Sequence, residues 1–163
     1  MKILFLLRHA KSDWGDDSQP DFERPLNPRG DRDSKAVGAY LMQKSITPDL
    51  ILSSSATRAR ETTENLVTSS GLPTEVRFDQ RIYEANREQL LEVIAEIESS
   101  VESVLMVGHN PGIEALLHFV TGKLEAVPTA TLAKVQLKIT SWRDVAARVG
   151  TLEWIVRPKE DLN

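Results

Sequence analysis

The chain has 163 residues, of which 40% are hydrophobic and 27% charged, with only 8 glycines and 8 prolines. This composition excludes disordered, collagen-like and low-complexity proteins, and the length predicts a single domain over residues 1–163. The formal net charge of -4 gives the whole molecule no attraction for nucleic acid or an anionic membrane, and the lack of cysteine excludes disulfides, thiolate metal ligands and a cysteine nucleophile.

The first predicted element is a strand over residues 2–7, which is continuously apolar after Lys2. Such a run is typical of a strand covered on both faces of a sheet. Arg8 and His9 interrupt it, and it is too short for a membrane span or a signal-peptide core. We therefore expect a cytoplasmic protein with no membrane partner.

The next segment, residues 11–28, is rich in Asp, Gly and Pro and shows no periodicity. It is longer than a plain connection between two elements. A functional loop over a site is the favoured interpretation, and a loose surface excursion is the alternative.

Strands and helices then alternate along the chain. Apolar runs predict strands at residues 49–53, 75–78 and 103–108, the second being the weakest. Between them, steps of three or four residues predict two helix faces: Val37, Tyr40, Leu41 and Lys44; and Leu90, Ile94, Ile97 and Val101.

Capping residues predict the ends of two more helices. Serines before residue 57 are expected to cap a helix that Gly71 ends, and Asn110 is expected to cap one that starts at Pro111 and ends at Gly122. After residue 129 an alternating pattern predicts two antiparallel strands that close the sheet. The predicted fold is a single-domain three-layer α/β/α sandwich with a mostly parallel central sheet and an antiparallel C-terminal strand pair.

Charged and histidine side chains follow the strands at their carboxyl ends, where open α/β sheets bind ligands. Arg8 and His9 follow the first strand, Arg58 begins the helix after the second, His109 follows residues 103–108, and Glu84 comes after the weak strand. Arginine forks and helix N-termini bind phosphate, so this edge predicts a phosphate site with a histidine nucleophile.

Each of these residues also has an ordinary structural interpretation. Arg8 and His9 alone would be read as a surface pair, Arg58 as a solvated helix residue, and His109 as a satisfied histidine at a turn. Their coincidence at one edge favours the site. His118, within an apolar helical stretch, is predicted to pack or to be half-exposed, and the ligand spacing fits zinc poorly, so no metal is expected.

Four motifs in order make the chain resemble the histidine phosphatase superfamily, and within it the small phosphohistidine phosphatases of the SixA type. They are "FLLRHA" (residues 5–10), "RPLNPRG" (24–30), Ser54, Arg58, Ala59 and Thr62 in the pattern Ser-x-x-x-Arg-Ala-x-x-Thr, and "VGHNPG" (107–112). One position departs from the superfamily pattern, because Ala10 stands where glycine is common. Glu84 stands where many superfamily members place a catalytic acid, although enzymes of the SixA type need not have one.

The resemblance implies that His9 is phosphorylated during turnover, that Arg8, Arg58 and His109 bind the phosphoryl group, and that water then releases phosphate. Neighbouring cations favour the neutral form that a histidine nucleophile needs. Because cations and positioning supply most of the catalysis in phosphoryl transfer, no metal or cofactor is expected.

The role expected for Glu84 depends on the leaving group of the substrate. An imidazole, with an unperturbed pKa of about 6.5, departs with little help, whereas an alkoxide benefits from a general acid. Glu84 is therefore expected to assist ester hydrolysis or a proton transfer with water, with a structural role as the alternative.

A short chain without room for a large lid predicts a phosphohistidine-bearing signalling or phosphotransfer protein as the substrate partner. Trp14 and Phe22 are candidates for contacting it or for packing the loop, and Arg24 either guides substrate or braces the loop by an ion pair. The alternatives are a small-molecule phosphomonoesterase of the same superfamily and a non-catalytic phosphate-binding module.

Overall fold

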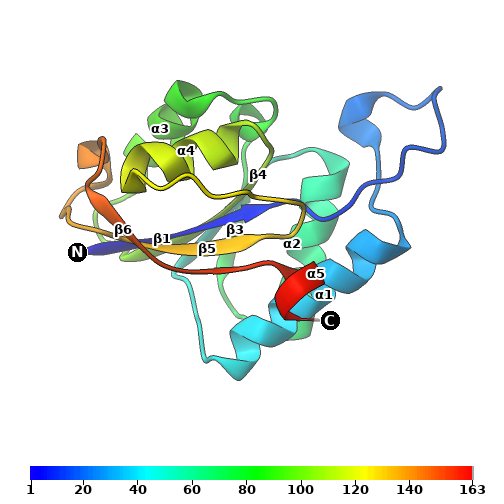
Figure 1. Ribbon diagram of the computed structural model, residues 1–163, viewed down its shortest axis with the longest axis horizontal. Coiled ribbons are helices and arrows are strands. Elements are labelled where there is room, and N and C mark those ends of the chain that lie inside the picture. The colour runs from blue at the N-terminus through cyan, green and yellow to red at the C-terminus, as the bar shows by residue number, and fades with distance from the viewer. Residues whose placement is uncertain (163) are drawn as a thin grey trace.

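The computed structural model describes residues 1–162, which form a six-stranded sheet with helices on both faces (Figure 1). The strand order is β3-β2-β4-β1-β5-β6. The first four of these strands run parallel, whereas β5 pairs antiparallel with both β1 and β6. The strands are β1 (Lys2–Arg8), β2 (Leu50–Ser53), β3 (Glu75–Phe78), β4 (Ser103–Gly108), β5 (Leu132–Leu137) and β6 (Gly150–Val156). The predicted fold class is confirmed.

Two helices cover one face of the sheet, and three lie on the other side (Figure 1). The first pair is α3 (Arg87–Ala95) and α4 (Gly112–Thr121); the other helices are α1 (Pro28–Gln43), α2 (Thr57–Ser70) and the short α5 (Pro158–Asp161). Short 3-10 turns are η1 (Asp21–Glu23), η2 (Gln80–Ile82) and η3 (Trp142–Asp144). None of the helices within residues 1–162 is long and apolar enough to cross a membrane.

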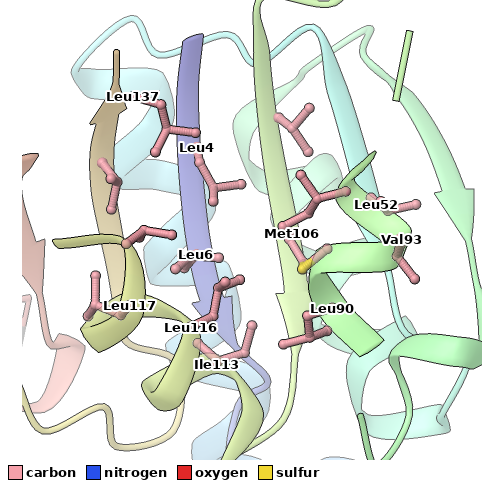
Figure 2. Packing of buried hydrophobic residues seen from close by; sticks show 14 of the residues in the cluster. Leu4, Leu6, Leu52, Leu90, Val93, Met106, Ile113, Leu116, Leu117 and Leu137 are labelled. Carbon is pink, nitrogen blue, oxygen red and sulfur yellow. The ribbon is translucent and has the colours of Figure 1, made fainter. Parts of the chain in front are cut away.

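The apolar run of β1 is explained by a core on each side of the sheet. Leu4 and Leu6 point to the face covered by α3 and α4, where Figure 2 shows them among side chains of the neighbouring strands and both helices. Phe5 and Leu7 point the opposite way, into the cluster under α1 and α2. Because successive side chains of a strand alternate between faces, both sets of side chains between the terminal Lys2 and Arg8 of this central strand are apolar.

The helix boundaries correct part of the sequence-based prediction. The N-cap of α2 is Ala56, without a side-chain cap, so the prediction of a serine N-cap was wrong. The helix α4 begins one residue later than expected, although the Asn110 Oδ1 does accept a hydrogen bond from the Glu114 N–H. Gly71 and Gly122 end their helices in the left-handed conformation, as predicted.

The first turn of α1 lies directly against the segment that follows β1. A Cβ on Gly30 would overlap the backbone of Lys11, so only glycine allows this approach. The N–H of Asn27 donates to the same Lys11 carbonyl at 3.0 Å, and the Asn27 side chain caps α1. The "RPLNPRG" segment thus fixes the return of the loop over residues 11–28, which Ser12 and Leu26 also close with a β-bridge.

Candidate active site

The sheet topology brings the two strand-end histidines side by side. β1 and β4 are parallel neighbours with Arg8 opposite Gly108, and the N–H of His9 donates to the Gly108 carbonyl at 3.0 Å. The imidazole rings of His9 and His109 therefore lie with centroids 5.0 Å apart. They line a hollow of about 280 Å³ together with Arg8, Lys11, Ser12, Trp14, Arg58, Asn110 and Thr129.

His9 has one ring nitrogen engaged and one available. Its Nδ1 lies 2.7 Å from the carbonyl oxygen of Ala10, which can only accept, so Nδ1 carries the proton and Nε2 keeps its lone pair. Burial, aided by the guanidinium groups of Arg58 and Arg8, lowers the pKa of His9 to about 4 despite this hydrogen bond. The ring is therefore neutral at physiological pH and suited to nucleophilic attack through Nε2.

His109 forms its hydrogen bond through the other ring nitrogen, Nε2. Its Nε2 lies 2.8 Å from Ser54 Oγ, which also accepts from the N–H of Ala56. We assign the hydroxyl as the donor to Nε2, because its proton has no other acceptor in the described chain. The neutral ring then carries its own proton on Nδ1, which is buried and has no partner within residues 1–162. Burial lowers the pKa of His109 to about 3. His109 is thus an uncharged hydrogen-bond donor beside the hollow.

The Arg8 side chain adds a second unpaired donor. Its Nη1 donates to the carbonyl of Val127 at 3.1 Å, whereas its Nε is buried without an acceptor in the described chain. Buried donors without partners are rare and point to an acceptor supplied by a bound group. Of the four such atoms in the described chain, Arg8 Nε and His109 Nδ1 belong to side chains that line the hollow, whereas Arg24 Nε and Thr131 Oγ1 do not.

Arg58 lies in the first turn of α2 and is hydrogen-bonded to the segment that follows β1. The Thr62 hydroxyl donates to the Arg58 carbonyl at 2.6 Å and accepts from the N–H of Ala10 at 3.0 Å. The Arg58 guanidinium donates through Nη1 to the Asp21 carbonyl at 2.7 Å and through Nη2 to Asp21 Oδ2 at 3.0 Å. The three residues of this motif therefore have different roles in the site. Ser54 is the hydrogen-bond partner of His109, Arg58 provides a cation, and Thr62 accepts the hydrogen bond from the N–H of Ala10.

The part of the chain that carries Arg8, His9 and Arg58 matches a known family. Residues 4–90 match the sequence model of the Histidine phosphatase superfamily (branch 1). This chain belongs to the histidine phosphatase superfamily.

Relatives of this superfamily member include proteins without an assigned activity. An uncharacterized chloroplastic protein of Arabidopsis thaliana is 31% identical over 160 residues, spanning 93% of this chain and 73% of that protein. An uncharacterized protein of Mycobacterium tuberculosis is 34% identical over 159 residues, spanning 88% of this chain and 97% of that protein.

Solved structures of histidine phosphatases superpose on nearly the whole chain. A candidate phosphohistidine phosphatase SixA from Agrobacterium tumefaciens is 30% identical with a TM-score of 0.83, covering 96% of this chain and 98% of that one. The protein histidine phosphatase SixA complexed with tungstate shares the fold at 22% identity and a TM-score of 0.79, covering 97% and 98% of the two chains.

Three further residues that the sequence suggested as substrate contacts, Trp14, Arg24 and Phe22, differ in whether they reach the pocket of this histidine phosphatase. Trp14 lines the hollow and is 61% exposed. Arg24 does not line it: its guanidinium stacks on the Trp14 ring at 4.2 Å, and its Nε lies 3.6 Å from Asp21 Oδ1. Phe22 packs edge-on against Tyr83 with centroids 4.9 Å apart. Of the two roles left open for Arg24 and for Phe22, the contacts fit bracing and packing of the loop.

Glu84 is exposed and does not line the hollow. It has a left-handed backbone with φ of 55° and follows Tyr83, whose hydroxyl donates to Asp21 Oδ2 at 2.6 Å. Burial and the nearby carboxylates of Asp21 and Glu84 raise the pKa of Tyr83. The carboxylate of Glu84 thus lies at the outer edge of the site rather than among the phosphate-binding groups.

Sequence analysis missed the roles of four residues near the pocket: Ser54 as the partner of His109, and Asp21, Tyr83 and Thr129. Ser54 belongs to the recognised motif but was interpreted as a helix cap. The other three carry no local signal, since their contacts depend on how the loops fold. His118 is exposed on α4. Within residues 1–162 no cluster of three or more His, Asp or Glu side chains could hold a metal ion.

Proposed function

We propose that this protein is a protein-phosphohistidine phosphatase that acts without a metal, through a covalent intermediate on His9. The observation that carries the proposal is the neutral His9 ring, whose unprotonated Nε2 shares a hollow with the cations Arg8 and Arg58 and the donor His109. Superfamily membership supports hydrolysis of a phosphorylated substrate.

The proposed reaction has two steps. His9 Nε2 attacks the phosphorus of the substrate phosphohistidine, the P–N bond of the substrate breaks, and the departing imidazole takes up a proton from water. Water then attacks the phosphorus, the P–N bond to His9 breaks with its electron pair returning to Nε2, and inorganic phosphate leaves with the protons of the attacking water. One of these protons neutralises the hydroxide formed in the first step. Arg8, Arg58 and His109 hold the phosphoryl oxygens in both steps, and this preorganised charge stabilises each transition state.

A protein substrate is favoured by the form of the pocket. The hollow of about 280 Å³ is bounded on its loop side by Lys11, Ser12 and Trp14, and Trp14 is exposed to solvent. A phosphohistidine side chain projecting from a signalling or phosphotransfer protein can reach such a site. The similarity to SixA structures supports the same class.

A small-molecule phosphomonoesterase is the second candidate, because Glu84 lies at the edge of the site where an acid could serve an ester leaving group. The test compares kcat/KM for a phosphohistidine-carrying phosphotransfer domain with kcat/KM for a panel of sugar, glycerate and aryl phosphates. We expect the phosphoprotein to be preferred by at least about tenfold, a difference of about 1.4 kcal/mol in transition-state stabilisation. Faster turnover of a small ester would establish the second candidate instead.

A further inference from the structure

The Asp21 side chain joins the loop before α1 to several groups around the pocket. Its Oδ2 accepts hydrogen bonds from Arg58 Nη2 at 3.0 Å and from the Tyr83 hydroxyl at 2.6 Å. Its Oδ1 lies 3.6 Å from Arg24 Nε, and its backbone carbonyl accepts from Arg58 Nη1 at 2.7 Å. A single residue on a 3-10 turn thus makes four polar contacts with three residues, Arg24, Arg58 and Tyr83.

We propose that Asp21 is a positioning residue that fixes the guanidinium of Arg58 toward the phosphoryl group, an inference that rests on the proposed phosphatase function. A guanidinium has five N–H donors, of which Asp21 engages one on each terminal nitrogen. The other three remain for a bound oxyanion. Arg58 lines the hollow and Asp21 does not, so the carboxylate holds the arginine from outside the pocket.

The Asp21 carboxylate is itself held in place. The Tyr83 ring that donates to it packs against Phe22 at 4.9 Å and against the His109 ring at 5.5 Å, so the hydroxyl has a fixed direction. The hydrogen bond from Tyr83, followed by those from Arg58, lowers the pKa of Asp21 and keeps the carboxylate ionised at neutral pH. A fixed, charged acceptor restricts the rotamers of Arg58 before substrate arrives.

The same contacts are compatible with a second role for Asp21, which predicts the opposite change in oxyanion affinity when its charge is removed. If the Asp21 carboxylate competed with the phosphoryl group for Arg58, removing its charge would strengthen oxyanion binding. If it positions Arg58, removing its charge weakens binding, since a displaced catalytic group loses favourable geometry. The sign of the change in affinity therefore separates the two accounts.

The test measures binding of inorganic phosphate by titration calorimetry to the wild-type protein, Asp21→Asn and Glu23→Gln. Glu23 is an exposed acid on the same 3-10 turn with no side-chain hydrogen bond or ion pair in the described chain, so its variant controls for net charge. We expect Asp21→Asn to weaken the phosphate Kd by about tenfold, with an unchanged melting temperature, and Glu23→Gln to bind as the wild type does. Affinity of Asp21→Asn within twofold of wild type, or tighter, would overturn the inference.

Activity measurements keep this inference separable from the proposed function. With a phosphohistidine protein as substrate, Asp21→Asn should lower kcat/KM by a similar factor. A wild-type protein that binds phosphate but hydrolyses no phosphohistidine would contradict the proposed function alone. If Asp21→Asn does not fold, Tyr83→Phe replaces it, because it removes only the hydroxyl that orients the carboxylate; unchanged phosphate affinity in that variant would overturn the inference, and weaker affinity would support it.

Discussion

His9 and His109 lie with their ring centroids 5.0 Å apart, and they form hydrogen bonds through different ring nitrogens, His9 through Nδ1 and His109 through Nε2. The Ala10 carbonyl engages the protonated Nδ1 of His9 and leaves the Nε2 lone pair for attack. The Ser54 hydroxyl engages Nε2 of His109, and with this hydroxyl assigned as the donor the ring proton lies on the buried, unpaired Nδ1. The position of each hydrogen-bond partner therefore assigns nucleophile and donor.

The pH dependence of catalysis should reflect the depressed pKa of His9. The ring loses its nucleophilic lone pair only when it is protonated, which happens as the pH falls through about 4 rather than through the unperturbed value of 6.5. We expect kcat/KM for a phosphohistidine substrate to decrease on the acid side of its pH profile with a midpoint at about 4. The profile is corrected for ionisation and acid hydrolysis of the substrate. An acid limb centred near 6.5 would contradict a buried, neutral His9.

Ser54→Ala should lower activity without unfolding the protein. The variant removes the hydroxyl that holds His109 with its proton on Nδ1, so the ring can turn its lone pair toward the phosphoryl oxygens. We expect kcat/KM to fall by about tenfold or more. Ser55→Ala is the matched control, because Ser55 makes no side-chain hydrogen bond in the described chain; equal activities of the two variants would remove Ser54 from the site.

Thr62→Val should destabilise the fold at the segment that carries His9. The buried Thr62 hydroxyl accepts from the N–H of Ala10, and valine leaves that donor without a partner. An unsatisfied buried donor costs about 1–3 kcal/mol of the free energy of unfolding. Urea denaturation of Thr62→Val and of Thr68→Val, an exposed position on the same helix, measures the difference. If Thr62→Val lowers the free energy of unfolding no more than Thr68→Val does, the hydrogen bond from Ala10 contributes nothing to stability.

Glu84→Gln should separate the two substrate classes. Because Glu84 lies outside the hollow and an imidazole leaving group needs little acid assistance, hydrolysis of a phosphohistidine protein should stay within about twofold of wild type. Any activity on aryl or alkyl phosphates should fall, and its pH-rate profile should change. If the profiles for every substrate coincide with those of the wild type, Glu84 has only a structural role.

The fold was predictable where local patterns and core packing agree. The strands β3 and β4 both match the predicted ranges, but only β4 is an apolar run buried in the centre of the sheet. β3 is an edge strand without a buried residue, which explains its weaker sequence pattern. The helix α3 ends at Ala95, although the spacing of Leu90, Ile94 and Ile97 extends the predicted face further. Ile97 lies in the turn after α3 and is buried in the same hydrophobic core. The spacing of these apolar residues therefore indicates which side chains are buried, and it does not show where the helix ends.

The candidate site was predictable only as far as strand ends determine it. The rule that ligands bind at the carboxyl ends of parallel strands collected Arg8, His9, Arg58 and His109 at one edge, and the structure brings them around one hollow. Asp21 could not be found in this way, because its contact with Arg58 depends on the path of an irregular loop. Long-range contacts of a nonperiodic segment leave no pattern in a single sequence.

The most direct test of the account is whether His9 carries the phosphoryl group during turnover. In a rapid-quench experiment with a radiolabelled phosphohistidine protein, wild type and His118→Ala, whose histidine is exposed on α4, should transiently acquire acid-labile, base-stable label before free phosphate appears. His9→Ala should acquire no label and release essentially no phosphate. Phosphate release by His9→Ala at the wild-type rate, or label that persists on that variant, would contradict a covalent mechanism at His9.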